Sequence, residues 1–408
     1  MNCRHCSAPL TMQVIDLGSS PPSNAYLTQA GLHAPELWFP LRVLVCDQCR
    51  LVQTEDFAAH DALFTEEYAY FSSFSQSWLD HSRAYATAMV DRLGLNGDSL
   101  VVEVASNDGY LLQYFAQAGI ACLGVEPTHS TALAARERGI ESIEEFFGVA
   151  LAERLVAEGR AADLTAANNV LAHVPDINDF VAGFAVLLKP HGTATFEFPH
   201  LLCLIEENQF DTIYHEHFSY LSLLAVERIF ARNNLTVVDV ETLSTHGGSL
   251  RVFARRSDSN PGPVSERVVA VRAREAAAGM DGPAFYTGLQ PRAEAIRDAL
   301  LIFLIEAKRQ GRRVAAYGAA AKGNTLLNFA GVRPDLLPYV VDRNPAKAGK
   351  YMPGSRIPIV DEAHLQADRP DFILILPWNI KDEVMTQLAA AREWGAQFVV
   401  AIPQLNVL

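Results

Sequence analysis

Long apolar runs are missing from this chain of 408 residues. No window approaches eighteen uninterrupted apolar residues, and the start, Met1 to Cys6, lacks the apolar core of a secretory signal, so a cytoplasmic location and no membrane partner are expected. Positive charge is also scarce, because 33 Lys and Arg stand against 47 Asp and Glu. The net charge of −14 argues against nucleic acid as a partner, although a small phosphorylated ligand in a locally basic pocket is compatible with it.

Cysteine is sparse and unevenly placed. Of six cysteines, four form two C-x-x-C pairs, and in a chain without a secretion signal this spacing is typical of zinc held by four thiolates. Four protein ligands would close the coordination sphere, so the zinc would be structural. Two redox dithiols are the alternative. The expected metal ligands are Cys3, Cys6, Cys46 and Cys49, whereas Cys122 and Cys203 are expected to be ordinary buried small residues.

The chain is longer than one hydrophobic core usually supports, so several domains are expected. Its patterning predicts an α/β fold with five segments: a zinc-binding β module (1–60), a helical connector (61–97), a cofactor-binding Rossmann-like domain (98–257), a helical linker (258–300) and a second Rossmann-like domain (301–408). In the central domain the strand-like runs predict a doubly wound parallel sheet; they are 100–104, 121–125, 163–167, 192–198, 235–241 and 249–253.

Three segments of the central domain predict a nucleoside-binding crevice. The first strand runs into a turn of small residues, and the second ends at Glu126, where a carboxylate can accept hydrogen bonds from a ribose diol. The pattern G-x-G-x-x-G is missing, so a phosphate cradle is not predicted, and Glu126 alone has a bland alternative as a solvated carboxylate. Asn107 or Asp108 can pair with an ammonium group. The expected cofactor-binding residues are Glu103, Ala105, Asn107, Asp108, Gly109, Glu126, Pro127, Asn168 and Asn169. In these segments the chain resembles class I methyltransferases, which implies S-adenosylmethionine as cofactor.

The segment 210–220 concentrates titratable side chains. Two histidines, a glutamate and two tyrosines within seven residues are a high density for a structural loop. A second metal site is the weaker interpretation, because the H-E-x-x-H spacing is not met. General acid–base work fits better: a C-methyltransferase needs a base beside the carbon acid and a donor beside the forming enolate oxygen. The expected base is His217, with Glu216 orienting a hydroxyl or a histidine and Tyr214, Tyr68 or His173 donating.

Two glycine-containing turns are candidates for substrate contact. Gly318 to Asn324 follows a strand and opens a helix, so backbone N–H groups and Lys322 could meet a phosphate, although the P-loop spacing is not met and a packing turn is the alternative. His246-Gly247-Gly248 precedes the last strand of the central sheet. Those glycines either form a simple hairpin turn or leave the backbone uncovered, so that a substrate can approach it closely.

Over its whole length the chain resembles the nucleotide-sugar C-methyltransferases that make branched deoxysugars. The similarity lies in the paired C-x-x-C ends and in the segments 68–73, 103–109, 168–173, 210–220, 246–251 and 318–324. It implies that His217 acts as base with Tyr68, His173, Tyr214 and Glu216. It also implies a thymidine-diphosphate 4-keto-6-deoxy sugar as substrate, methylated at C3 or C5. The expected substrate-binding residues are Phe71, His246, Gly247, Arg251, Lys322, Asn324 and Asp342.

Other functions stay open from the sequence. An O- or N-methyltransferase could use His217 as a simpler base, and a non-catalytic nucleotide-sugar-binding protein would keep the crevice without turnover. The expected assembly is a monomer or a small homo-oligomer.

Overall fold

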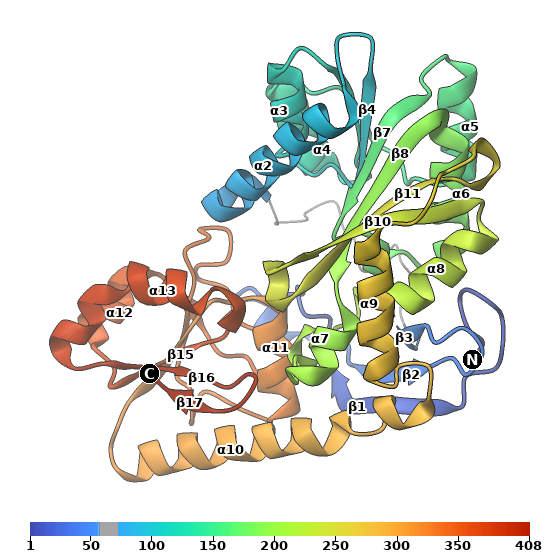
Figure 1. The fold of residues 1–408 in the computed structure, drawn as a ribbon. Helices are drawn as coiled ribbons and strands as arrows, with labels where there is room; N and C mark the ends of the chain where they lie inside the picture. The colour runs from blue at the N-terminus through green and yellow to red at the C-terminus, as the bar shows by residue number, and fades with distance from the viewer. Residues whose placement is uncertain (56, 58–71) are drawn as a thin grey trace.

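The computed structural model describes residues 1–55, 57 and 72–408, and these residues form three β-sheets with helices packed around them (Figure 1). The α/β fold class, with a β-rich N-terminal part and two α/β units, is confirmed. In the described part of the chain, no helix is long and apolar enough to cross a membrane.

The N-terminal sheet is antiparallel and includes a strand from far along the chain. Its order is β1-β2-β3-β9, with β1 at Met12–Ser20, β2 at Phe39–Val45, β3 at Val52–Thr54 and β9 at Ser219–Tyr220. Val52 pairs with Tyr220 and Gln53 with Ser219. The strand that follows the 210–217 segment therefore completes the sheet of the N-terminal module.

The central sheet has the order β10-β11-β8-β7-β4-β5-β6 among the described residues. Its strands are β4 Leu100–Val104, β5 Ala121–Val125, β6 Ser142–Ile143, β7 Ala162–Asn168, β8 Leu188–Pro199, β10 Leu235–Leu243 and β11 Ser249–Arg256. The prediction of an all-parallel sheet is wrong at β11, which is antiparallel to both β8 and β10. The reason is chain length: five residues join β10 to β11, enough for a hairpin but too few for a parallel crossover.

Helices cover both faces of this sheet, with α2 to α4 on one side and α5, α6 and α8 on the other (Figure 1). Helix α2 begins where the Ser75 hydroxyl accepts a hydrogen bond from the Trp78 N–H and ends at Gly94, which is left-handed. Helix α3 begins only after Gly109, whose φ of +75° is incompatible with a helix. The helices are α2 Gln76–Leu93, α3 Leu112–Gln117, α4 His129–Glu137, α5 Val149–Ala157, α6 Ile177–Leu187, α7 Leu201–Glu206 and α8 Leu223–Arg232.

The C-terminal sheet has the order β14-β13-β12-β15-β16-β17 and is parallel except for the β16–β17 pair. Strand β13 begins only after Pro338, which has no N–H to donate to a ladder. The elements are α9 Glu266–Ala277, α10 Leu289–Arg309, β12 Val314–Tyr317, α11 Ala321–Phe329, β13 Val340–Val341, β14 Ile359–Val360, α12 Glu362–Asp368, β15 Phe372–Ile375, α13 Lys381–Gln387, β16 Gln397–Val400 and β17 Asn406–Val407.

The N-terminal sheet and the C-terminal unit share one hydrophobic core. Ile15 and Val43 are fully buried in the same cluster as Leu300 and Leu304 of α10 and Leu326 of α11. Figure 1 shows α10 running along β1 at the base of the molecule. Each fully buried side chain of this size contributes roughly 1.5–3 kcal/mol, so the N-terminal module is held by its neighbours as well as by any metal.

Candidate active site and zinc centre

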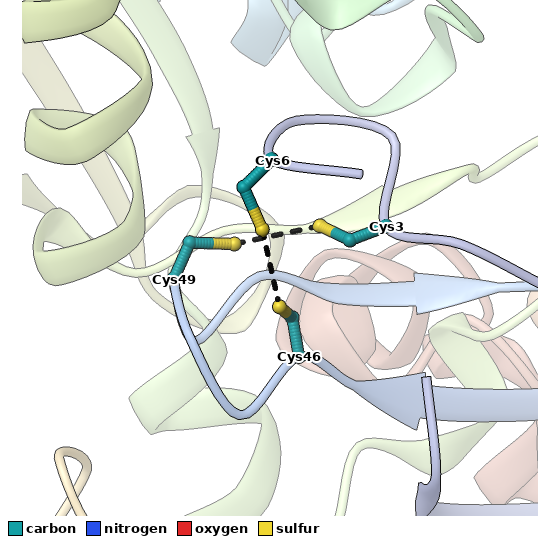
Figure 2. Close-up of side chains that lie close together, drawn as sticks. All are labelled: Cys3, Cys6, Cys46 and Cys49. Atoms are coloured by element: carbon teal, nitrogen blue, oxygen red, sulfur yellow. Dashed lines mark hydrogen bonds between the residues drawn. The ribbon is translucent and has the colours of Figure 1, made fainter. Parts of the chain in front are cut away.

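Four cysteine sulfurs converge at one end of the N-terminal sheet. Cys3 and Cys6 lie on the first loop, Cys46 and Cys49 on the turn between β2 and β3, and Figure 2 shows all four sulfurs pointing toward one another. The Sγ atoms lie within 4.8 Å of one another, and the Cys3–Cys49 and Cys6–Cys46 pairs are 3.4 Å apart. Tetrahedral zinc with Zn–S bonds of about 2.3 Å requires sulfurs roughly 3.8 Å apart, so this arrangement fits a closed structural zinc site.

The turn after β4 is built from unusual backbone conformations. Ala105, Asn107 and Gly109 have φ values of +56°, +49° and +75°. A Cβ on Gly109 would lie 3.1 Å from the side chain of Ile140, so space as well as φ favours glycine there. Glu126, at the end of β5 and just before Pro127, accepts hydrogen bonds from the Asn107 and Thr128 N–H groups at 2.9 Å each. The turn and the carboxylate therefore form one rigid unit, as the sequence suggested for a ribose site.

Asp108 has protein partners of its own. Its side chain is buried, forms an ion pair with Arg138 at 3.0 Å and accepts a hydrogen bond from the Ser73 hydroxyl. Arg138 also donates to the Asp108 carbonyl at 2.7 Å. The carboxylate is thus compensated by an internal cation, and the Asn107 side-chain oxygen accepts a hydrogen bond from the Ser72 N–H at 2.9 Å, so both proposed partners for a ligand ammonium already have protein contacts.

Several buried oxygens around this turn accept no hydrogen bond from the described residues. They are both carboxylate oxygens of Glu103, one of Asp108, and the amide oxygens of Asn168 and Asn169. Glu103 on β4 pairs with Ala166 of the adjacent strand β7, so these acceptors lie near the carboxyl ends of the two strands. Burial raises the pKa of Glu103 well above its usual value, although the nearby Tyr110 hydroxyl opposes this. A ligand rich in N–H and O–H donors, such as S-adenosylmethionine, fits this set of acceptors.

His217 has a fixed tautomer. Its Nδ1 lies 2.9 Å from the Thr212 carbonyl oxygen, and because a carbonyl only accepts, Nδ1 carries the proton and Nε2 keeps its lone pair. The pKa of His217 is held well below 6.5, chiefly by burial and then by electrostatic interaction with neighbouring His173, His246 and Lys322. The ring is therefore neutral near pH 7, with one nitrogen available to accept a proton.

Aromatic rings and a cavity surround His217. The Tyr214 ring lies 3.9 Å from the His217 ring between centroids, and the His173 ring lies 4.6 Å away edge-on. His173 donates from Nδ1 to the Glu216 carbonyl at 2.7 Å. A cavity touches this cluster; its lining residues are Ala172, Phe198, Pro199, Leu201, Leu204, Thr212, His217, Ser219, Tyr220 and Leu221. The structure thus brings His217, Tyr214, His173 and Glu216 together as the sequence predicted.

Glu216 is buried and bound to the N-terminal module. One carboxylate oxygen accepts a hydrogen bond from the Asn24 side chain at 3.2 Å, while the other has no partner in the described chain. Burial raises the pKa of Glu216. Asn24 was missed by the sequence analysis, because a loop after two prolines gives no signal of contact with residue 216.

Lys322 reaches this cluster from the C-terminal unit. Its Nζ donates to the Asn379 side chain at 2.7 Å and lies 4.7 Å above the Trp378 ring. Asp211 accepts a hydrogen bond from the Trp378 indole at 2.8 Å, and burial raises its pKa to about 6 despite the nearby Lys322. Asp211, Trp378 and Asn379 were not among the predicted site residues, since their proximity follows only from the packing of two units.

The other predicted substrate residues have mixed surroundings. Arg251 is buried and pairs with Glu197 at 2.7 Å and with Glu241 at 3.2 Å, so its guanidinium is already neutralised. His246 is left-handed, and its Nε2 lies 3.1 Å from the Asn169 amide nitrogen. A Cβ on Gly247 would lie 2.5 Å from the Trp378 ring. The missing side chain at Gly247 therefore leaves room for the Trp378 ring.

Asn324 and Asp342 are engaged within the protein. Asn324 donates to the Ser23 carbonyl at 2.6 Å, and the Asp342 carboxylate accepts from the N–H groups of Ala319 and Asn344 at 2.8 Å each. Tyr68 and Phe71 lie outside the described residues.

Comparison with known proteins identifies the family. The chain is 35% identical over 406 residues to the C-methyltransferase NovU of Streptomyces niveus, and the match spans all of this chain and 96% of that protein. The chain belongs to the C-methyltransferases. Family models match it in three parts: a zinc binding domain at 3–64, a methyltransferase domain at 78–240 and a C-methyltransferase C-terminal domain at 244–403. This C-methyltransferase therefore depends on S-adenosylmethionine and has a zinc-binding domain formed around the four cysteines.

Other similarities are partial. A ubiquinone biosynthesis O-methyltransferase of Bordetella avium is 32% identical over 98 residues, which cover 24% of this chain and 41% of that protein. Magnesium protoporphyrin IX methyltransferase from Synechocystis, solved with bound S-adenosylhomocysteine, is 17% identical with a TM-score of 0.36, covering 44% of this chain and 83% of that one. A methyltransferase from Clostridium acetobutylicum is 9% identical with a TM-score of 0.35, covering 44% and 92%.

The buried histidines give the C-methyltransferase a pH-dependent stability. The pKa of His246 is lowered to about 4, mainly by burial and then by Lys322, whereas a histidine in the unfolded chain has a pKa of about 6.5. Between these values the unfolded state binds more protons, so the free energy of unfolding falls as pH falls, by up to about 1.4 kcal/mol per pH unit for this residue. Denaturant unfolding between about pH 7.5 and pH 4.5 should show a shallower decrease for His246→Gln than for the wild type.

The comparison must be made as a difference between the two proteins. Buried carboxyl groups with raised pKa values, such as Asp211, gain a proton in the folded state and act in the opposite direction. These carboxyl groups are the same in wild type and variant, so their contribution cancels in the difference between the two free energies of unfolding. Parallel curves for wild type and variant would contradict the assignment of His246 as a partly buried, neutral histidine.

Proposed function

We propose that this C-methyltransferase methylates the carbon next to the ketone of a nucleotide-linked 4-keto-6-deoxy sugar, with thymidine diphosphate as the nucleotide and C3 or C5 as the methylated carbon. The observation that carries the proposal is the state of His217, a neutral histidine whose Nε2 keeps its lone pair. A carbon acid next to a ketone needs a base of this kind before the carbon can act as a nucleophile.

His217 is proposed to accept the proton of the substrate carbon on its Nε2. The hydrogen bond from Nδ1 to Thr212 then stabilises the imidazolium that forms. Tyr214 and His173, whose rings contact His217, are proposed to donate to the developing enolate oxygen, and Tyr68 is proposed to assist them. The second carboxylate oxygen of Glu216 is proposed to accept a hydrogen bond from a sugar hydroxyl. S-adenosylmethionine supplies the electrophilic methyl group.

The cofactor-binding residues are proposed to be the turn Ala105 to Gly109, together with Glu103, Glu126, Pro127 and the pair Asn168 and Asn169. The buried acceptors without partners near the carboxyl ends of β4 and β7 support the proposal, because the ammonium and ribose hydroxyls of the methyl donor would satisfy them.

Substrate contact is proposed for Lys322, His246 and Phe71. Arg251, Asn324, Asp342 and Gly247 are proposed to hold these residues in place, since each already contacts other parts of the chain.

The direct test is an acceptor panel. Purified protein is incubated with S-adenosylmethionine and nucleotide-linked 4-keto sugars, and the products are analysed by mass spectrometry and NMR. We expect a mass gain of one methyl group and a new carbon–carbon bond at C3 or C5. In D2O with S-adenosylhomocysteine in place of the methyl donor, deuterium should enter the same carbon. Methylation without any such exchange would contradict the enolate mechanism.

Lys322→Met is expected to weaken binding of thymidine diphosphate at least about tenfold. A hydrogen bond to a charged group contributes roughly 1.5–3 kcal/mol, and each 1.4 kcal/mol is a factor of ten in Kd. Isothermal calorimetry measures the change. The control is Lys308→Met, because Lys308 lies on α10 and pairs with Asp335 at the surface. Equal Kd values for Lys322→Met and the wild type would remove Lys322 from the phosphate site.

A further inference from the structure

A cysteine, a histidine and a glutamate form a chain of contacts behind the β10–β11 turn. The Cys203 Sγ on α7 lies 4.0 Å from His200 Nδ1, and His200 Nε2 lies 2.7 Å from a carboxylate oxygen of Glu275 on α9. His200 and Glu275 are both buried, at 2% and 3% side-chain exposure. Cys203 and Cys122 are both only partly buried, so the expectation that they are ordinary buried residues is wrong.

The order of hydrogen bonds directs a proton from sulfur toward the carboxylate. Glu275 accepts from the Leu223 and Leu224 N–H groups at 2.7 and 2.8 Å, which fixes its oxygens at the start of α8. A carboxylate only accepts, so His200 Nε2 donates to it and Nδ1 faces the sulfur. The Glu275 and Cys203 partners raise the pKa of His200 against the effect of burial.

A cation stands beside the same sulfur. Arg274, next to Glu275 on α9, interacts with the Cys203 sulfur and is ion-paired with Glu206 at 2.9 Å. The charged groups that face Cys203 are therefore His200, Arg274 and, through them, Glu275 and Glu206. Exchange with a disulfide proceeds through the thiolate, so a neighbouring proton acceptor and a neighbouring cation favour the reaction.

The thiol also touches the turn that carries His246. A Cβ built on Gly248 would lie 2.7 Å from Cys203 Sγ, and the Gly248 carbonyl accepts a hydrogen bond from the His200 N–H at 2.9 Å. A group added to this sulfur has little room unless the turn moves.

We propose that Cys203, His200 and Glu275 form a reactive thiol site that exchanges with low-molecular-weight disulfides and thereby displaces the turn at residues 245–248. The Cys203 thiol gives its proton to His200 Nδ1, and the thiolate attacks one sulfur of the disulfide. The disulfide bond of the reagent breaks as the new S–S bond to Cys203 forms, and the leaving thiolate takes up a proton. The disulfide is the oxidant, and a thiol reductant reverses the reaction.

The first measurement is the reaction rate of the zinc-loaded protein with 2,2′-dithiodipyridine, followed by release of pyridine-2-thione and located by peptide mass spectrometry. At neutral pH, Cys203 is expected to react at least about tenfold faster than Cys122, which is also partly buried but lies in no such cluster. Because the proton passes to His200, the rate should fall by less than tenfold per pH unit below about pH 8. Cys203→Ser should lose the fast phase and Cys122→Ser should keep it.

A Cys203 rate no faster than that of Cys122, or one that falls tenfold per pH unit below about pH 8 as for an ordinary thiol, overturns the proposal. His200→Asn should slow the reaction, and because this substitution also changes a buried contact with Glu275, the wild-type pH profile decides independently.

The second measurement is hydrogen–deuterium exchange of the peptide that contains residues 245–248. Exchange should be faster in the mixed disulfide than in the free thiol and should return to its original rate after dithiothreitol. Unchanged exchange in the fully modified protein overturns the coupling. Neither measurement uses a methyl acceptor, so the outcome does not depend on the proposed substrate.

Discussion

His217→Asn is expected to lower methyl transfer by about 10²- to 10⁴-fold while binding of S-adenosylmethionine stays within about twofold. Asparagine keeps a hydrogen-bonding side chain of similar size but cannot accept the carbon-bound proton at neutral pH. The wild-type ring is suited to this step, because Nδ1 donates to the Thr212 carbonyl and the low pKa keeps Nε2 unprotonated. Initial rates by mass spectrometry and cofactor affinity by calorimetry measure the two effects separately.

The matched control is His215→Asn. His215 is a histidine of the same segment, but its Nε2 faces the carbonyl oxygens of Phe39 and Pro40 at 3.2 and 3.3 Å, away from the Tyr214 ring that covers His217. We expect this variant to lose stability and to keep most of the rate per folded molecule. Two equally impaired variants, or a fully active His217→Asn, would show that His217 is not the base.

Cys46→Ser is expected to release zinc and to lower the melting temperature by at least about 5 °C. Zinc binding in isolated zinc-finger peptides amounts to roughly 10–16 kcal/mol at pH 7, so a lost thiolate ligand sacrifices a large stabilising contribution. Methyl transfer should fall as well, although no zinc ligand touches the cavity, because the zinc module holds the 217–220 segment. The Thr54 hydroxyl donates to the His217 carbonyl at 3.0 Å, and β3 pairs with β9 directly after it.

Zinc content per chain and differential scanning calorimetry, on the same samples, test this expectation. Cys122→Ser is the control, since Cys122 lies on β5 outside the cysteine cluster. It should keep one zinc per chain and nearly the wild-type melting temperature. Full zinc occupancy in Cys46→Ser, with an unchanged melting curve, would refute the four-cysteine site.

Strands with strong local patterns could be predicted from the sequence. The first two strands of the central sheet were predicted at 100–104 and 121–125, where the structure has β4 and β5, because continuous apolar runs are bounded there by clear turns. The two-residue strands β6 and β9 were missed, since two residues carry no period. Strand direction also escaped the pattern: β11 looks like any buried strand, and only the short connection from β10 makes it antiparallel.

The residues of the candidate site also fall into two groups, those that a local sequence pattern predicted and those that it missed. His217, Glu216 and Tyr214 were found because they lie together in the sequence, and His173 because it follows a strand end on the same crevice. Asn24, Asp211 and Trp378 were missed, because their contacts join segments that are separated by more than 150 residues. Such contacts follow from how the units pack, which no local pattern encodes.

The pairing of β3 with β9 also sets an order of events during translation. Residues 52–54 leave the ribosome well before residues 219–220 exist, so the growing chain carries β3 as an unpaired sheet edge until most of the central unit has been made. Exposed edges invite pairing with other chains, and a fragment truncated at residue 60 would keep that edge permanently. The N-terminal segment is therefore a poor choice for expression alone, even with its four cysteines intact.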